Sequence, residues 1–157
     1  MFLIDKVPYP AVDEFSIKGF FKEYRFLSNY HLCNVLYNGY NYPSSEHAYM
    51  AAKTDDPFHK SVLANGISTP KLAKAYGQTI PLVDNWDKIK IMVMIDVIYC
   101  KFSQNSGILK LLLETGNREL EETNYWNDTY WGVCNSIGHN NLGKSLMAVR
   151  RRILDAQ

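Results

Sequence analysis

The sequence predicts an α+β fold that is mainly helical and has a short β part near its N-terminus. Two observations carry this prediction. Up to about residue 43, short extended segments with aromatic clusters alternate with turns, whereas after Pro43 the capping and stop signals are those of helices. The chain has 157 residues and shows no internal repeat, low-complexity tract or linker. We therefore expect one compact, mainly helical domain spanning residues 1–157.

In the N-terminal part, the dipeptide Asn38-Gly39 is typical of a hairpin turn and predicts a pair of strands at 35–37 and 40–42. Helices are predicted where a cap or an early proline opens a segment, as Ser44 and Thr69-Pro70 do, and a glycine often closes it. They cover 44–54, 57–66, 70–77, 86–102, 106–115 and 141–154. The segment 86–102 is apolar almost all round, so we expect it to be a central buried helix.

Charge and cysteine content limit the classes of function. The net charge is +1, so no strongly basic surface points to nucleic acid or membrane as the main partner. The basic run Arg150–Arg152 is either a solvated helix face or a local contact with a nucleic-acid backbone. Three cysteines without CxxC spacing favour a reducing, cytoplasmic location, and no apolar run is long enough to span a membrane.

Glu46 falls in the first turn of the predicted 44–54 helix, where the helix dipole favours a carboxylate. Lys53 follows seven residues later, on the same face and about 10 Å along the axis. That spacing is too long for a salt bridge within a helix. The pair is therefore either two independent surface groups or two groups that face one ligand.

The histidines stand apart from one another and from any cysteine or HExxH pattern, and no nucleophile has a companion base nearby in the sequence. We therefore expect no metal site and no cofactor.

The segment NYWNDTYWG, at 124–132, places Trp126 and Trp131 around Asp128. Aromatic planes beside a carboxylate suit a flat heterocycle, although a packed loop with Asp128 as a turn residue would also use these residues. Farther on, Asn141 and Gly143 begin the last helix, where backbone N–H groups can hold a phosphate. A helix cap with a closely packed glycine is the alternative there.

Taken in order, the segments EYRFLSNY, YPSSEHAYMAAKT, a Trp before a long apolar helix, NDTYWGV and NNLGKSLMAVR resemble the YbiA-like NADAR family. The resemblance runs from about residue 18 to residue 154. It implies a compact α+β domain dominated by helices. It also implies an N-glycosidase that cleaves the bond between C1′ of a ribose and a nitrogen.

The resemblance also implies site residues. Glu46 would be the essential acid, with Asp128 as its partner; one of them would stabilise positive charge on the ribose or activate water. A lysine could instead form a Schiff base with C1′, and Lys53 and Lys22 are the candidates. The substrate-binding residues would be Ser28, Asn29, Trp86, Trp126, Trp131, Gly132, Asn141 and Gly143.

Three functions follow from the resemblance. The first is removal of ADP-ribose from guanine bases of nucleic acid or nucleoside, which would reverse ADP-ribosylation. The second is hydrolysis of phosphoribosylated intermediates of riboflavin synthesis. The third is a non-catalytic module that binds ADP-ribose or NAD.

Overall fold

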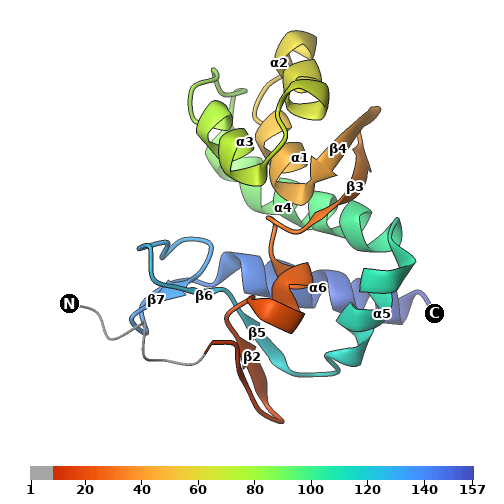
Figure 1. The fold of residues 1–157 in the computed structure, drawn as a ribbon, viewed down its shortest axis with the longest axis vertical. Coiled ribbons are helices and arrows are strands. Elements are labelled where there is room, and N and C mark those ends of the chain that lie inside the picture. The colour runs from red at the N-terminus through yellow and green to blue at the C-terminus, as the bar shows by residue number, and fades with distance from the viewer. Residues whose placement is uncertain (1–8) are drawn as a thin grey trace. The chain divides into compact units, whose positions relative to one another are not determined.

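A computed structural model describes residues 9–157 (Figure 1). These residues divide into two compact units, which we call the terminal unit, residues 9–28 with 111–157, and the inserted unit, residues 29–110. Both units combine helices with strands, which confirms the predicted α+β class. The prediction of one domain over residues 1–157 stays a prediction.

The inserted unit begins with the β-hairpin that the sequence predicts. Strands β3 (Leu32–Tyr37) and β4 (Tyr40–Ser44) pair antiparallel. The turn residues Asn38 and Gly39 both have positive φ angles, 49° and 88°, as a tight hairpin turn of this hand requires. The Asn-Gly signal is therefore confirmed.

Helices fill the rest of the inserted unit. They are α1 (Ser45–Ala51), α2 (Pro57–Ser61), a π-helical turn (Val62–Gly66), α3 (Pro70–Gly77) and α4 (Trp86–Ser103). The hydroxyls of Ser44 and Thr69 accept hydrogen bonds from N–H groups in the first turns of α1 and α3, which confirms both predicted caps.

Helix α1 ends earlier than residue 54, where the sequence places its end. The N–H groups of Lys53 and Thr54 bond to carbonyls three residues back, at Met50 and Ala51, so the chain tightens into a turn. Pro57 follows closely and opens α2. Lys53 therefore lies in the turn after α1 and not on the helix itself.

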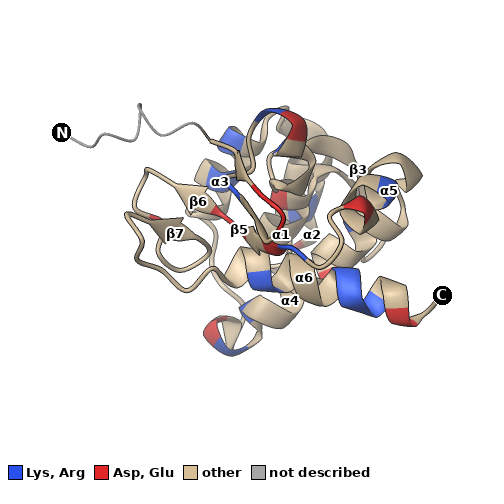
Figure 2. Ribbon diagram, turned by 90° about the horizontal axis from the view of Figure 1, so that it is seen from below, with Lys and Arg blue, Asp and Glu red and all other residues tan. Residues whose placement is uncertain are grey.

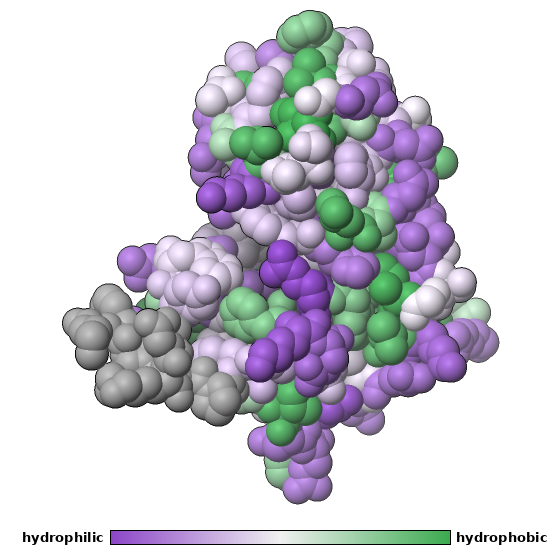
Figure 3. All heavy atoms as spheres, viewed as in Figure 1, coloured by the Kyte–Doolittle hydropathy of each residue, from purple (hydrophilic) through white to green (hydrophobic). Residues whose placement is uncertain are grey.

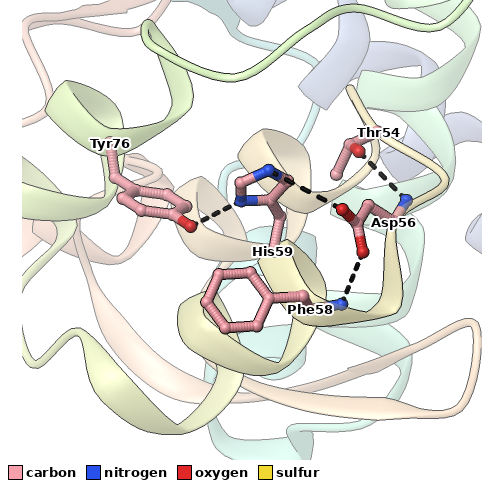
Figure 4. Close-up of polar contacts among 5 residues, drawn as sticks. All are labelled: Thr54, Asp56, Phe58, His59 and Tyr76. Atoms are coloured by element: carbon pink, nitrogen blue, oxygen red, sulfur yellow. Dashed lines mark hydrogen bonds and ion pairs between the residues drawn. The ribbon is translucent and has the colours of Figure 1, made fainter.

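Side-chain bonds fix the segment that follows this turn (Figure 4). The Thr54 hydroxyl accepts from the Asp56 N–H at 3.0 Å, and the Asp56 carboxylate caps α2 by accepting from the Phe58 N–H at 2.9 Å. His59 reaches Asp56 at 3.8 Å and the Tyr76 hydroxyl at 2.6 Å. Since Tyr76 belongs to α3, these contacts tie α2 to α3.

Helix α1 is the centre of the inserted unit. All its residues are buried, and it packs against α3, α4 and the hairpin. Gly77 of α3 lies so close to the Met50 side chain of α1 that a Cβ atom there would collide with it. The close approach of the two helices therefore requires glycine at this position.

The prediction of a fully buried helix is wrong for the first half of α4. Met92 is 68% exposed, and Ile89 and Ile91 are exposed as well, whereas Met94 and Lys101 are buried. Periodicity predicts the helix, but an all-round apolar pattern does not tell which faces other elements cover.

The terminal unit contains β-structure from both ends of the chain. Strand β2 (Ser16–Lys18) pairs antiparallel with β1 (Ala11–Val12) and parallel with β5 (Glu119–Glu121). A short 3-10 helix, η2 (Lys22–Leu27), follows β2. Strands β6 (Thr123–Asn124) and β7 (Val133–Cys134) form a second parallel pair.

The β part is therefore not confined to the N-terminal third. Strands β5 to β7 were missed because two or three residues are too few to show alternation, and because β5 is acidic at both ends. The pairing itself buries Ile17 opposite Leu120, and both are fully inaccessible to solvent.

Helix α5 (Ser106–Glu114) and helix α6 (Asn141–Asp155) confirm the last two predicted helices. Helix α6 packs against β5 through its apolar face, which includes Leu146 and Val149. Its polar face carries basic residues, drawn in blue in Figure 2.

Arg150 is not part of a solvated basic run. It is 7% exposed, and its guanidinium donates to the Thr115 hydroxyl at 2.8 Å and to the Arg118 carbonyl at 2.9 Å. Arg151, in contrast, is exposed and pairs with Asp155 one helical turn later. Arg150 therefore ties α6 to the segment that leads into β5.

Exposed apolar side chains on the face shown in Figure 3 form separate groups among hydrophilic ones. Within residues 9–157, no helix combines the length and the apolar character needed to cross a bilayer.

We predict that Arg150→Met lowers the free energy of unfolding by about 2 to 4 kcal/mol, because it leaves one buried and one part-buried acceptor without their charged donor. Arg151→Met should change it by less than about 0.5 kcal/mol, since exposed ion pairs contribute little. Urea denaturation of both variants and the parent measures this. Equal effects of the two substitutions would contradict the anchoring role of Arg150.

Candidate functional site

The first turn of α1 places Glu46 in a buried position. The Glu46 N–H donates to the Asn29 carbonyl at 3.2 Å, and the Ser45 hydroxyl donates to the Asn29 side-chain oxygen at 2.9 Å. The Asn29 amide contacts the Met94 sulfur at 3.4 Å. Glu46 and Asn29 are each only 7% exposed. Asn29 therefore holds the start of the helix that carries the carboxylate.

His47 locks the same helix start. One ring nitrogen, Nε2, donates to the Ile67 carbonyl at 2.9 Å, and the other, Nδ1, lies 2.7 Å from the Ser44 hydroxyl. A carbonyl only accepts, so Nε2 carries the proton, and burial lowers the pKa of His47. His47 is therefore a neutral structural clamp beside Glu46.

Lys53 is electrostatically coupled to Glu46. Burial lowers the pKa of Lys53, the Glu46 carboxylate raises it, and Lys74 and Lys90 lower it further, so that the net shift is downward. The Lys53 carbonyl accepts from the Val83 N–H at 2.8 Å, which fixes the turn. Lys53 is thus not electrostatically independent of Glu46, and the common ligand stays a prediction.

Trp86, another predicted site residue of the inserted unit, begins α4. It is 6% exposed, and its ring lies 5.3 Å from the Tyr49 ring of α1, centroid to centroid. Trp86 thus packs the start of α4 onto the helix that carries Glu46. Its contact with a substrate stays a prediction.

In the terminal unit, residues 125–132 form a loop between β6 and β7 that we call the aromatic loop. Asn124, which is 2% exposed, organises it. Its side-chain oxygen accepts from the N–H groups of Trp126 and Asp128, at 3.2 and 3.1 Å, and its amide donates to the Asp128 carbonyl at 2.8 Å. The conformation of the loop is thus fixed by one buried side chain.

Asp128 shapes the aromatic loop as well. One carboxylate oxygen accepts from the N–H groups of Tyr130 and Trp131, at 3.2 and 2.9 Å. This is the turn-forming role that the sequence allows for Asp128. A direct role in catalysis stays a prediction.

The predicted residues Gly132 and Gly143 lie at close backbone approaches. A Cβ atom at Gly132 would collide with the Glu122 carbonyl, and one at Gly143 with the Leu120 carbonyl. The N–H of Asn141 donates to the Tyr130 carbonyl at 3.3 Å. Both glycines therefore allow two backbone segments to pack closely. The start of α6 also holds the aromatic loop through the Asn141 N–H.

The start of α6 has fewer backbone N–H groups available to hold a phosphate than the sequence suggests. The N–H of Leu142, next after Asn141, donates to the Trp131 carbonyl at 2.9 Å. Two of the first N–H groups of the helix therefore bond to the aromatic loop.

The remaining predicted residues lie in the terminal unit too. Lys22 is exposed, has a positive φ of 52° and begins η2, and Ser28 follows the end of that helix. Trp126 is about half exposed, and the Trp131 ring meets the Tyr130 ring edge to face at 5.0 Å. The structure thus groups Glu46, Lys53, Asn29 and Trp86 in one unit and the other site residues in the other.

Sequence reasoning missed Asn124 and Asn140. Asn140 is buried just before α6, accepts from the Glu122 N–H at 3.0 Å and donates to the Leu120 carbonyl at 2.9 Å. The sequence did carry a partial signal for Asn140, because asparagine tolerates the positive φ angle that this residue adopts. What it bonds to depends on chain segments far away in the sequence.

Among residues 9–157, no three His, Cys, Asp or Glu side chains gather in a way that could hold a metal ion. The expectations of no metal and no cofactor stay predictions.

Comparisons with known proteins agree with this architecture. The solution structure of the Escherichia coli protein YbiA has a TM-score of 0.82 to this one at 29% identity, over 93% of this chain and 89% of that chain. The N-glycosidase YbiA of Escherichia coli K12 is 32% identical over 134 residues, which are 83% of this chain and 82% of the relative. An N-glycosidase of Nostoc punctiforme is 36% identical over 113 residues, 69% of this chain and 72% of the relative.

A riboflavin biosynthesis protein of Vibrio vulnificus is 35% identical over 132 residues, 82% of this chain, but the chain spans only 35% of that relative's length. The chain is an enzyme of the N-glycosidase class, a hydrolase that acts on N-glycosyl bonds. Residues 15–154 match the NADAR domain, and the chain belongs to this family.

We predict that the His47 clamp makes stability fall in acid. The pKa of His47 is lowered in the folded protein, so below the ordinary histidine pKa of about 6.5 the unfolded chain binds a proton that the folded chain does not. Its contribution is present above that pH and is lost as the pH falls. The melting temperature of wild type should thus drop more steeply from pH 7 to pH 5 than that of His47→Gln. Parallel curves would contradict this assignment.

Proposed function

We propose that the protein hydrolyses the bond between C1′ of an ADP-ribosyl group and a guanine base, in nucleic acid or in a nucleoside. The observation that carries the proposal is the buried Glu46 carboxylate coupled to Lys53, with Lys74 and Lys90 near enough to influence the same lysine. A carboxylate suits the positive charge that develops on the ribose. Ammonium groups beside it suit a substrate that carries phosphates.

The reaction needs two proton transfers. As the C1′–N bond breaks, its electron pair goes to the base nitrogen, and the ribose gains oxocarbenium character. Glu46 stabilises this charge or removes a proton from the water that attacks C1′. The leaving base must take up a proton, and Asp128 is the proposed second acid. The products are the free base or nucleoside and ADP-ribose.

A covalent route is the alternative to direct attack by water. In that route the ribose ring opens first: the C1′–O4′ bond breaks and O4′ takes up a proton. The neutral amine of Lys53 then adds to C1′, the base leaves with a proton, and water hydrolyses the resulting Schiff base. The lowered pKa of Lys53 increases the fraction of free amine near neutral pH. Lys22 is the other candidate, but it is exposed.

The second candidate substrate is a phosphoribosylated intermediate of riboflavin synthesis. The name of the Vibrio vulnificus relative favours it. It shares the phosphate and the C1′–N bond with the first candidate, so Lys53, which is coupled to Glu46, suits both substrates. Membership of the N-glycosidase class disfavours the third possibility, a module that only binds ADP-ribose or NAD. We propose that the protein acts in the cytoplasm, which its three free cysteines favour.

The test is to incubate the protein with ADP-ribosylated guanosine and, separately, with the phosphoribosylated pyrimidine, and to follow products by mass spectrometry. We expect free guanosine and ADP-ribose from the first substrate. We also predict that Glu46→Gln lowers turnover by at least about 100-fold while ADP-ribose affinity stays within a few-fold, because the amide cannot offset the developing charge.

Glu114→Gln, at an exposed carboxylate, is the matched control and should keep full turnover. Release of product from the phosphoribosylated pyrimidine alone would contradict the first candidate substrate and support the second, the intermediate of riboflavin synthesis. Full activity of Glu46→Gln would overturn the role of Glu46.

We predict that borohydride added during turnover traps a covalent adduct on the peptide that contains Lys53, and that the yield rises with pH as more amine is free. Lys53→Arg should abolish the adduct although it keeps the positive charge. Peptide mass spectrometry locates the adduct. An adduct that persists in Lys53→Arg and disappears in Lys22→Arg would assign the Schiff base to Lys22, and no adduct in wild type would favour direct attack by water.

A further inference from the structure

Three aromatic rings of the terminal unit form a cluster that we call the aromatic platform: the half-buried Phe21 and the exposed Tyr125 and Trp126. The centroids of Phe21 and Tyr125 lie 6.4 Å apart with the rings 19° from parallel. Trp126 meets both rings edge to face, at 6.4 Å from Phe21 and 5.1 Å from Tyr125. Each ring thus contacts the other two, although the residues come from opposite ends of the chain.

The platform is exposed and yet held rigidly. Tyr125 is 54% exposed and Trp126 is 49% exposed. The buried Asn124 side chain fixes the backbone at Trp126, as described above. Phe21 packs over Gly19, where a Cβ atom would come within 3.1 Å of the ring. A loop anchored by a buried amide therefore presents aromatic faces to solvent, at the cost of exposed apolar area.

The geometry limits how a ligand can bind. A flat ring sandwiched between Phe21 and Tyr125 would need about 7 Å, two contacts of about 3.5 Å each. The rings are 6.4 Å apart, so the ligand must stack on the outward faces. Lys22 follows Phe21 in the sequence, and the net charge of the chain is only +1. Attraction therefore depends mainly on stacking and only weakly on charge.

Flat, uncharged rings with polar edges are the chemistry of nucleobases, and half-exposed aromatic side chains bind them with little regard to sequence. We propose that the aromatic platform stacks an unmodified base of a single-stranded nucleic acid, next to the base that carries the glycosyl group. This inference rests on the proposed function for the position of the reactive base. Trp126 and the proposed acid Asp128 belong to one loop, and the same Asn124 side chain holds the backbone at both residues.

The test measures binding without catalysis. A fluorescein-labelled, unmodified single-stranded octanucleotide of mixed sequence is titrated with the full chain, and anisotropy is recorded. Tyr125→Leu and Trp126→Leu should each weaken binding about five-fold or more, the range found when one base loses its stacking partner. Trp126→Phe should recover part of the loss. Phe15→Leu, at an aromatic side chain that is 73% exposed but outside the platform, is the matched control and should bind like wild type.

Two further comparisons sharpen the result. The same sequence as a duplex should bind more weakly, because its bases already stack on one another. Raising the salt from 50 to 200 mM should change single-strand affinity by less than about ten-fold, since few phosphates are contacted.

Wild-type binding that is absent, or that Phe15→Leu weakens as much as Trp126→Leu does, would overturn the inference; the second result would indicate a general apolar surface for a protein partner. Strand binding without turnover of ADP-ribosylated guanosine would refute the proposed function alone. Turnover without strand binding would refute the platform alone.

Discussion

The candidate site depends on buried asparagine side chains that bond to the backbone. A buried amide must satisfy both its donor and its acceptor, so each such side chain ties chain segments together. In the inserted unit, Asn29 accepts from the first turn of α1 and contacts Met94. In the terminal unit, Asn124 fixes the aromatic loop, and Asn140 joins α6 to the chain between β5 and β6. These bonds place charged and aromatic side chains that have no strong positional preference of their own.

The same principle explains the electrostatics around Glu46. Burying a carboxylate is costly unless cations or hydrogen bonds compensate, and the coupled Lys53 supplies one such cation. The compensation is mutual, because burial would otherwise lower the pKa of Lys53 further. Helix α1 can therefore bury Glu46 beside a compensating cation.

Local signals predicted the fold where the cause is local. Caps at Ser44 and Thr69 and the Asn38-Gly39 turn act within four residues, and the structure confirms all three. The parallel pairing of Ile17 with Leu120 could not be predicted, since each strand is too short to signal a partner about a hundred residues away. Likewise, the sequence did not predict that Arg150 would be a buried anchor, since its partners Thr115 and Arg118 lie more than thirty residues away.

The family pattern mixes two kinds of residue. Gly132, Gly143 and Asn140 hold backbones at close approaches, so this chain needs them for its fold whatever its substrate. In the proposed reaction, Glu46 and Lys53 supply charge at C1′, and that need is common to different leaving groups. Neither kind distinguishes guanine from a pyrimidine intermediate. On the proposed function, the half-exposed rings of Tyr125 and Trp126 separate a nucleic-acid substrate from a free intermediate, because only the nucleic acid carries a neighbouring base to stack on them.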